Sequence, residues 1–267
     1  AAQLNTIAAA TTGKVTATLA PATTIDAATV ALLKDVKATD VITFKTTDTD
    51  LVGKDDLNAL LAIKKLIPNA DFSAINVINA DAKDVALVKN VLKDVAANVA
   101  VTIDAAGQIS AADANAIAKA TNGIVTATIK DGGIAATLKA LSDVKNTDII
   151  RFKTTDKSVK ASDLVDLAAK LANPSSSFDK SKIETITGTA AETGAGKAIP
   201  LALTALGATT NAEVKITGNV PVANINAILL ATTGKVTATV AATATQLLAV
   251  LDNAKSTDAL TLEVSVG

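Results

Sequence analysis

The chain has 267 residues, 49% of them apolar and 19% charged, and its formal net charge at neutral pH is −1. This apolar content excludes a disordered chain, while the balanced charge and 1% aromatic content argue against nucleic-acid binding, which needs a basic stripe and stacking rings. Cys, Met, Trp, Tyr and His are absent, which excludes disulfides, thiolate chemistry and soft metal sites. These are also the readily oxidised side chains, so the composition favours an abundant extracellular protein.

A signature of the form Asn-x-Ile-x-x-Ala-Thr-x-Gly-x-Val-Thr-Ala-Thr occurs three times, at 5–18, 115–128 and 226–239. A second signature, Lys-x-Thr-Asp, follows each copy, at 37–40, 145–148 and 255–258. Two ordered signatures that recur in step indicate tandem duplication. We predict repeat units at 1–109 and 110–219, and a partial unit at 220–267, in one continuous body.

Each copy of the first signature predicts the end of a helix that passes into a strand. Gly13, Gly123 and Gly234 fall where a residue just past a helix end adopts positive φ, so we expect that conformation there. Val-Thr-Ala-Thr then supplies β-branched residues that alternate between two faces. A helix with apolar residues at helical spacing and the Lys-x-Thr-Asp turn come next, followed by a second strand at Val41–Thr46, Ile149–Thr154 and Ala259–Val264.

Further helices and strands are predicted between these pairs. Proline disfavours helical geometry at the residue before it, so Pro68 and Pro174 stop two of the helices. The predicted helices are Leu57–Leu66, Asp84–Ala96, Leu164–Leu171 and, more weakly, Ile199–Leu206. The predicted strands are Ile75–Asn79, Val99–Ile103, Ile183–Thr187 and Glu213–Thr217.

The pattern amounts to about ten short strands with a helix in nearly every interval, which is long enough for the crossover that parallel pairing needs. The fold class is therefore α/β, and two arrangements compete. One is a solenoid of strand–helix rungs, in which a rung is one strand with its helix and stacks only on its neighbours. The other is a set of tandem doubly wound domains. We favour the solenoid and an elongated body, because the chain holds about two and a half units without a flexible linker between them.

Four carboxylates around Gly53 form the densest acidic group of the sequence. Oxygen-rich loops of this kind bind calcium, which makes the group a weak calcium candidate. The second unit keeps only Asp156 and Asp163 in the equivalent stretch, and the alternative is a polar turn that caps the next helix. The candidate ligands are Asp48, Asp50, Asp55 and Asp56.

Other motifs favour structure over chemistry. The run Gly194-Ala-Gly196-Lys197 is similar to a phosphate-binding loop, but its first glycine is misplaced and Ala198 replaces the metal-binding hydroxyl residue. In each Lys-x-Thr-Asp turn, the lysine suits a helix C-terminus and the aspartate suits a turn. No nucleophile stands at a recognisable spacing from a base, so we expect no enzyme and no cofactor apart from the calcium candidate.

The three Val-Thr-Ala-Thr units, the stretch Ile109–Asn115 and the Ala/Thr/Val/Asp-rich, cysteine-free composition resemble repeat regions of large secreted bacterial surface proteins. These include S-layer-like, adhesin and haemolysin-type repeat proteins. The resemblance implies a structural module on the cell surface or outside the cell that assembles into a layer, filament or stalk. The alternative it leaves open is an adhesin or ligand-binding module that uses the open face of the sheet.

The ends of the chain indicate how such a module finds partners. No apolar run approaches the ~20 residues that span a bilayer, and no leader remains, so we expect a processed or excised piece. The chain begins inside a repeat unit, at the helix that holds Asn5 and Ile7, and it stops on a strand with Leu262, Val264 and Val266. Neither end looks like a polar capping unit, which predicts an unpaired edge and an uncovered apolar face. We expect self-association through the chain ends, or cover from flanking repeats, with a cell-envelope glycan as a further candidate partner.

Overall fold

The computed structural model describes residues 1–19, 24–207, 210–251 and 253–264, which form a mixed α/β structure with parallel sheets. Every strand pairing with a defined register in this part of the chain is parallel. The α/β class and the parallel pairing predicted from the helix-filled intervals are therefore confirmed.

The chain divides into two compact units by its internal contacts. The first unit holds Ala1–Lys130 and Leu141–Arg151, and the second holds Asp131–Ala140 and Phe152–Gly267. The border thus crosses strand β7 (Ile149–Lys153). This division reflects how segments pack, whereas the borders predicted after residues 109 and 219 mark a sequence duplication. The repeat units therefore stay a prediction.

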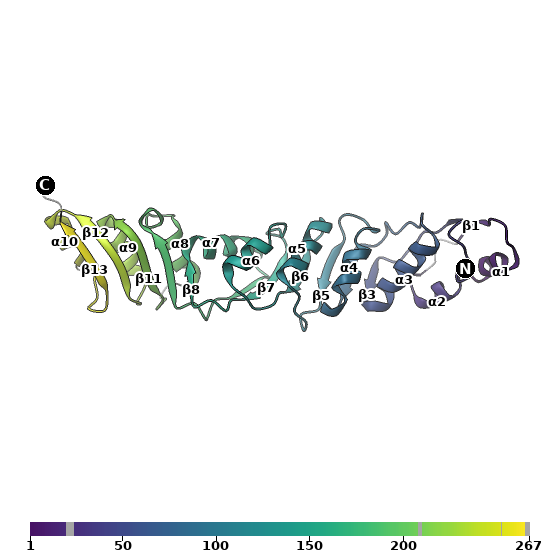
Figure 1. Cartoon of the computed structure of the whole chain (residues 1–267), viewed down its shortest axis with the longest axis horizontal. Helices are drawn as coiled ribbons and strands as arrows, with labels where there is room; N and C mark the ends of the chain where they lie inside the picture. Colours follow the sequence, from purple (N-terminus) through teal and green to yellow (C-terminus); the bar gives the residue numbers. More distant parts are fainter. Residues whose placement is uncertain (20–23, 208–209, 252, 265–267) are drawn as a thin grey trace. The chain divides into compact units, whose positions relative to one another are not determined.

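In the first unit, strands pair in the order in which they occur along the chain. β1 pairs with β2, and a longer sheet runs β3-β4-β5-β6-β7. Helix α2 packs on α3, α3 on α4 and α4 on α5, and Figure 1 shows these helices following one another beside the strands. The helices are α1 (Ala2–Ala10), α2 (Ala27–Ala31), α3 (Gly53–Leu66), α4 (Val85–Val91) and α5 (Ala111–Ala120), with a 3₁₀ turn at Ala82–Asp84. The strands are β1 (Thr16–Thr18), β2 (Val41–Thr43), β3 (Asp50–Val52), β4 (Val77–Ala80), β5 (Ala100–Ile103), β6 (Val125–Thr128) and the first residues of β7.

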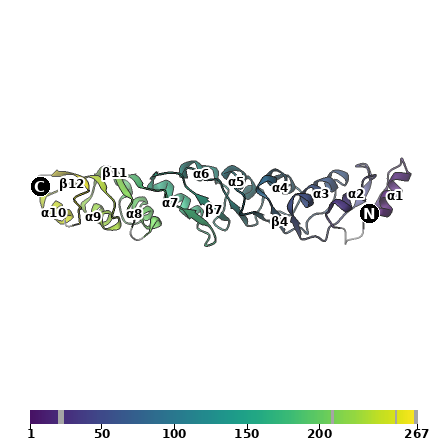
Figure 2. The same cartoon turned by 90° about the horizontal axis from the view of Figure 1, so that it is seen from below.

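The second unit repeats this plan. Its main sheet has the order β8-β10-β11-β12-β13, and β9 lies beside the end of β7. Figure 2 shows α8, α9 and α10 in a row along one face of the sheet that holds β11 and β12. The helices are α6 (Ile134–Ala140), α7 (Ala161–Lys170), α8 (Ala198–Leu206), α9 (Val222–Ala231) and α10 (Ala244–Leu251), with a 3₁₀ turn at Ala190–Glu192. The strands are β8 (Ser158–Lys160), β9 (Ser177–Asp179), β10 (Thr185–Thr189), β11 (Glu213–Val220), β12 (Val236–Ala242) and β13 (Ala259–Val264).

The core follows from the alternation along the strands. In β6, Val125 and Ala127 are buried while Thr126 is half-exposed, as expected when one face of a strand is covered by helices. Aromatic residues reinforce the same place in both units, because Phe44 lies 5.8 Å from Phe72 and Phe152 lies 5.5 Å from Phe178 between ring centroids.

Two predictions of local structure were incomplete. The helix expected at Asp84–Ala96 is only Val85–Val91 long, because bonds such as the one from the Asp94 N–H to the Val91 carbonyl (2.9 Å) turn the chain toward β5. The three-residue strands β3, β8 and β9 were not predicted, since segments this short and polar carry no alternation.

Candidate functional site

Asp48, the first calcium candidate, bonds to the segment just ahead of α2. Its Oδ2 accepts the N–H of Ile25 at 2.5 Å, while its own N–H donates to Thr46 Oγ1 at 3.0 Å. The second unit repeats this arrangement, since Asp156 Oδ2 accepts the N–H of Ile134 at 2.7 Å. Asp48 and Asp156 therefore both hold neighbouring segments together. A calcium ion at Asp48 would have to share the carboxylate with the N–H of Ile25.

The other three candidates lie around the start of α3. Asp50 is exposed in β3, and Asp55 and Asp56 belong to the first turn of the helix. Asp56 Oδ2 accepts the N–H of Val52 at 2.8 Å, so an acidic residue does cap this helix, but from inside its first turn. In the described residues, no three His, Cys, Asp or Glu side chains gather as a metal-binding group. Calcium binding by these carboxylates stays a prediction.

The aspartates of the Lys-x-Thr-Asp turns tie neighbouring segments together, and Asp40 and Asp148 are buried while Asp258 is half-buried. Asp148, 1% exposed, accepts the N–H of Val125 at 2.9 Å and the N–H of Lys145 at 2.8 Å. Asp40 and Asp258 make the equivalent pairs of bonds. At Asp40, the N–H groups of Val15 and Lys37 hold the pKa of the carboxyl below its usual value. Each aspartate thus joins its own turn to the strand before it.

The lysine of each turn completes what we call the Lys–Asp clasp: Lys37 with Asp40, Lys145 with Asp148, and Lys255 with Asp258. The Nζ atoms of these lysines donate to the carbonyls of Thr11, Thr121 and Thr232, at 2.7, 2.7 and 2.6 Å. Those carbonyls end helices α1, α5 and α9, where backbone acceptors lack helical partners and a cation is favoured. The structural role predicted for these turns is confirmed.

The signature glycines have a role that differs from the predicted one. The positive-φ glycines in the described residues are Gly53, Gly196, Gly207 and Gly218. The prediction of positive φ at Gly13, Gly123 and Gly234 was therefore wrong.

Close approach between backbones explains the later two glycines. A Cβ on Gly123 would lie 2.3 Å from the Val99 carbonyl oxygen, and a Cβ on Gly234 would lie 2.3 Å from that of Ala212. A Cβ on Gly13 would meet only Thr11 Oγ1, at 3.4 Å. Glycine is thus required where the turn presses against the preceding strand, and the first copy has no such neighbour within the described residues.

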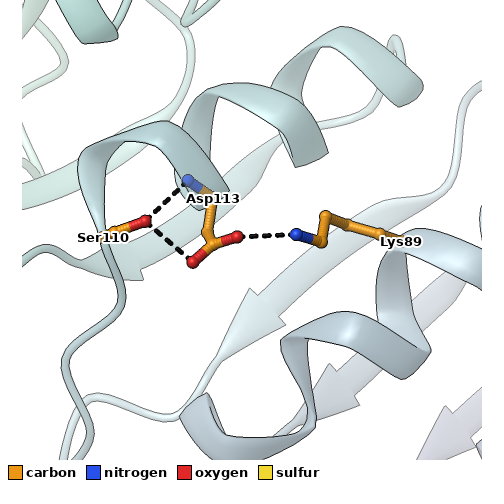
Figure 3. A network of polar contacts seen from close by, with 3 residues as sticks. All are labelled: Lys89, Ser110 and Asp113. Atoms are coloured by element: carbon orange, nitrogen blue, oxygen red, sulfur yellow. Dashed lines mark hydrogen bonds and ion pairs between the residues drawn. The ribbon is translucent and has the colours of Figure 1, made fainter.

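A polar network joins helices α4 and α5. Lys89 Nζ lies 2.7 Å from Asp113 Oδ1, and Ser110 caps α5 by accepting the Asp113 N–H at 3.0 Å (Figure 3). The Lys89 ammonium, and after it the Ser110 hydroxyl, lower the pKa of Asp113 below its usual value. Because Lys89 and Asp113 are both about one-third exposed, we assign this network to alignment of adjacent helices.

A hollow of about 310 Å³ lies in the first unit at the carboxyl ends of β3, β4 and β5. Ligands of open α/β sheets gather at such ends. Asp81 there pairs with Lys83 at 2.9 Å, and Asp104 accepts the N–H of Ala106 at 3.0 Å. The lining residues are Val52, Gly53, Asn79, Ala80, Asp81, Thr102 and Asp104.

The glycine run ahead of α8 is a tight turn. The N–H of Lys197 donates to the Gly194 carbonyl at 2.9 Å, and α8 begins directly afterwards at Ala198. The turn thus satisfies its own backbone groups, which accords with the interpretation of this run as a connection.

Two surfaces expose apolar residues that are buried at equivalent positions elsewhere. Ile7 is 56% exposed, whereas Ile117 and Ile228, at the same place in the signature, are 0% exposed. Leu262 in β13 is 39% exposed, whereas Phe44 and Phe152, four residues after the clasp aspartate like Leu262, are 1% and 3% exposed. The sequence predicted an uncovered apolar surface at both places, at the helix that holds Ile7 and at the strand that holds Leu262.

No protein-family model, curated protein or solved structure matches the chain. None of the described helices is long and apolar enough to cross a bilayer.

Proposed function

We propose that the chain is a structural repeat module of a cell-surface or extracellular assembly, a layer, filament or stalk, in which its rungs form a solenoid. Within each unit the strands pair largely in chain order, and the helices from α2 to α5 and from α6 to α10 each pack on the next, which is how stacked rungs are built. The Lys–Asp clasp recurs in three copies with the same bonds. Such repeated contacts between neighbours support a scaffold.

The observation that carries the assembly is the edge of β13. In the described residues this strand pairs with β12 on one side only, through the register Thr237↔Ala259 to Ala242↔Val264. Leu262 and Val264 on it are 39% and 62% exposed. An exposed apolar edge is a template for another strand, supplied by a neighbouring copy or by flanking repeats.

A heterologous contact of this kind extends without closing unless rotation brings the ends together. It therefore yields filaments or layers. The extracellular setting is supported by the absence of oxidisable side chains.

Sedimentation velocity over a range of concentrations, with negative-stain electron microscopy, tests this proposal. We expect concentration-dependent assembly of the chain and loss of assembly in Val264→Lys. Val266, the other residue predicted at this edge, lies outside the described residues. Leu230→Lys is the matched control, because Leu230 is 70% exposed on α9 and away from the strand edge. The proposal is refuted if the chain stays monomeric at millimolar concentration and Val264→Lys sediments in the same way.

A second candidate is an adhesin or ligand-binding module, and the hollow at the carboxyl ends of β3–β5 favours it. Carboxylates and the Asn79 amide line this hollow, and such groups bond sugar hydroxyls. A cell-envelope glycan is the partner that this candidate takes. Glycan-array binding that is lost in Asn79→Ala but kept in Asn58→Ala, an exposed α3 residue, would support it over the scaffold.

A further inference from the structure

The surface made by Ile7, Thr11, Thr12 and Gly13, which we call the first-rung surface, carries residues that serve inter-rung contacts elsewhere in the chain. In the second copy, Ile117 is fully buried where α5 packs on α4. In the third copy, Ile228 is fully buried where α9 packs on α8. In the first copy, Ile7 is more than half exposed. Isoleucine thus occupies this position in all three copies, and the copies differ only in whether a neighbouring helix covers it.

The polar residues of the signature show which neighbouring segment covers the isoleucine. In the second copy, the Thr121 hydroxyl donates to the Ala97 carbonyl at 3.1 Å and also bonds the Val99 carbonyl, while the Asn122 N–H donates to Ala97. These carbonyls belong to the turn that enters β5.

The third copy makes the same contacts with the turn ahead of β11. There the Thr232 hydroxyl donates to the Thr210 and Ala212 carbonyls at 3.1 and 2.7 Å, and the Thr233 N–H donates to Thr210 at 2.9 Å. Two independent sites in this chain thus use one recognition pattern.

The first copy has the same groups, and among the described residues no such partner faces them. Thr11, Thr12 and Gly13 occupy the positions of the donors and of the close-approach glycine. Thr11 Oγ1 accepts the Gly13 N–H at 3.0 Å, as Thr121 does for Gly123 at 2.9 Å and Thr232 does for Gly234 at 3.0 Å. The turn therefore already has the shape that it has when it is occupied.

We propose that the first-rung surface is a docking site for one further strand–helix rung of the β5 type. The occupant is a parallel strand whose entering turn presents two main-chain carbonyls to Thr11 and Thr12, and whose helix covers Ile7. Asparagine occupies the middle of that turn in both observed partners, at Asn98 and Asn211. This assignment deepens the proposed scaffold function and rests on it, because it names the element that a neighbouring repeat contributes.

Adding such a rung to the full chain tests the assignment. In both occupied copies the rung comes directly before the signature on the same polypeptide, so a second copy of Ala82–Ser110 is fused ahead of Ala1. The expected result is slower amide hydrogen exchange at Thr12, by about fivefold or more, because its N–H gains a carbonyl partner. A longer fusion, Gly53–Ser110, carries two rungs and is used if exchange within the shorter insert shows that it is unfolded.

The inserted Ser110 also supplies an N-terminal cap to α1, as it does to α5. Gly13→Ala distinguishes the effect of docking on exchange from the effect of that cap. In the unfused chain this change should leave exchange at Thr12 unaltered, since the new Cβ meets only Thr11 Oγ1 at 3.4 Å. In the fusion it should abolish the gain in protection, because the Cβ would now meet the docked carbonyls. A folded insert with unchanged exchange at Thr12, or a fusion that tolerates Gly13→Ala, overturns the assignment.

Protection of Thr12 that rises with concentration in the unfused chain would instead name a second copy as the occupant, and would overturn the β5-type rung. The readouts on the fusions come from dilute chains. Failure of the chain to form layers or filaments in the electron microscope is therefore a separate result, which refutes the scaffold function and not the docking.

Discussion

Gly123→Ala tests whether close backbone approach holds one rung on the next. The added Cβ would lie 2.3 Å from the Val99 oxygen, 2.4 Å from the Val99 carbonyl carbon and 2.6 Å from the Asn98 oxygen. Ordinary contacts begin near 3.4 Å, so the turn entering β5 must retreat by about 1 Å. Such overpacking costs ~1–3 kcal/mol, and the bonds from Thr121 and Asn122 that it strains add ~1 kcal/mol. We expect the free energy of unfolding to fall by about 2–4 kcal/mol.

The signature supplies its own controls. Gly234→Ala meets the Ala212 oxygen at 2.3 Å and should cost about as much as Gly123→Ala. Gly13→Ala should be neutral within ~0.5 kcal/mol or slightly stabilising, since it only restricts the unfolded chain.

Urea titration followed by circular dichroism gives the comparison, because the chain has no Trp or Tyr to report by fluorescence. Native-state hydrogen exchange locates the loss. If Gly123→Ala and Gly13→Ala are equally mild, the argument from backbone approach is wrong.

Three further predictions follow from the polar contacts. Asp148→Asn should lower the free energy of unfolding by ~1–3 kcal/mol in urea titration, because one of the two N–H groups that Asp148 accepts would then face an amide donor. If the variant is as stable as the parent, the clasp does not stabilise the fold. Lowered pKa values at Asp40 and Asp113 mean that the unfolded chain binds protons first as pH falls. Their stabilisation is therefore complete above about pH 4 and is lost at lower pH, which an acid titration of stability checks, and a rise in stability there would contradict it. EGTA should leave the melting temperature unchanged, whereas a drop of about ten degrees or more would make Asp48, Asp50, Asp55 and Asp56 a metal site.

The regular elements were predictable from the sequence where residue type and period agree. The strands at Ile149–Thr154 and Ala259–Val264 match β7 and β13 closely, because apolar and polar residues alternate there after a turn signal. Proline placed the ends of α3 and α7 correctly for an equally local reason. These features depend on neighbouring residues only.

The features that failed depend on residues of another rung. Glycine after a helix favours positive φ on average, and nothing within residues 111–128 reveals that the Val99 carbonyl lies against Gly123. The bond from Asp48 to Ile25, 23 positions earlier, was likewise absent from the prediction for the acidic cluster, whose calcium binding stays a prediction. The signature does not distinguish Ile7 from the buried Ile117 and Ile228, so the exposure of Ile7 could be predicted only from its place in the first copy.

The contacts between rungs have a consequence for how the chain reaches its native state. The bonds that clasp and signature residues make to neighbouring segments connect residues 20 to 30 positions apart, from Thr232–Ala212 to Asn5–Asp35. Relative to the chain length this is on the order of 0.1, a value at which loop closure is cheap and folding is fast. At ~5–20 residues per second of synthesis, each new segment of this size emerges within a few seconds. Each segment can therefore fold against the one before it while the ribosome is still synthesising the rest of the chain.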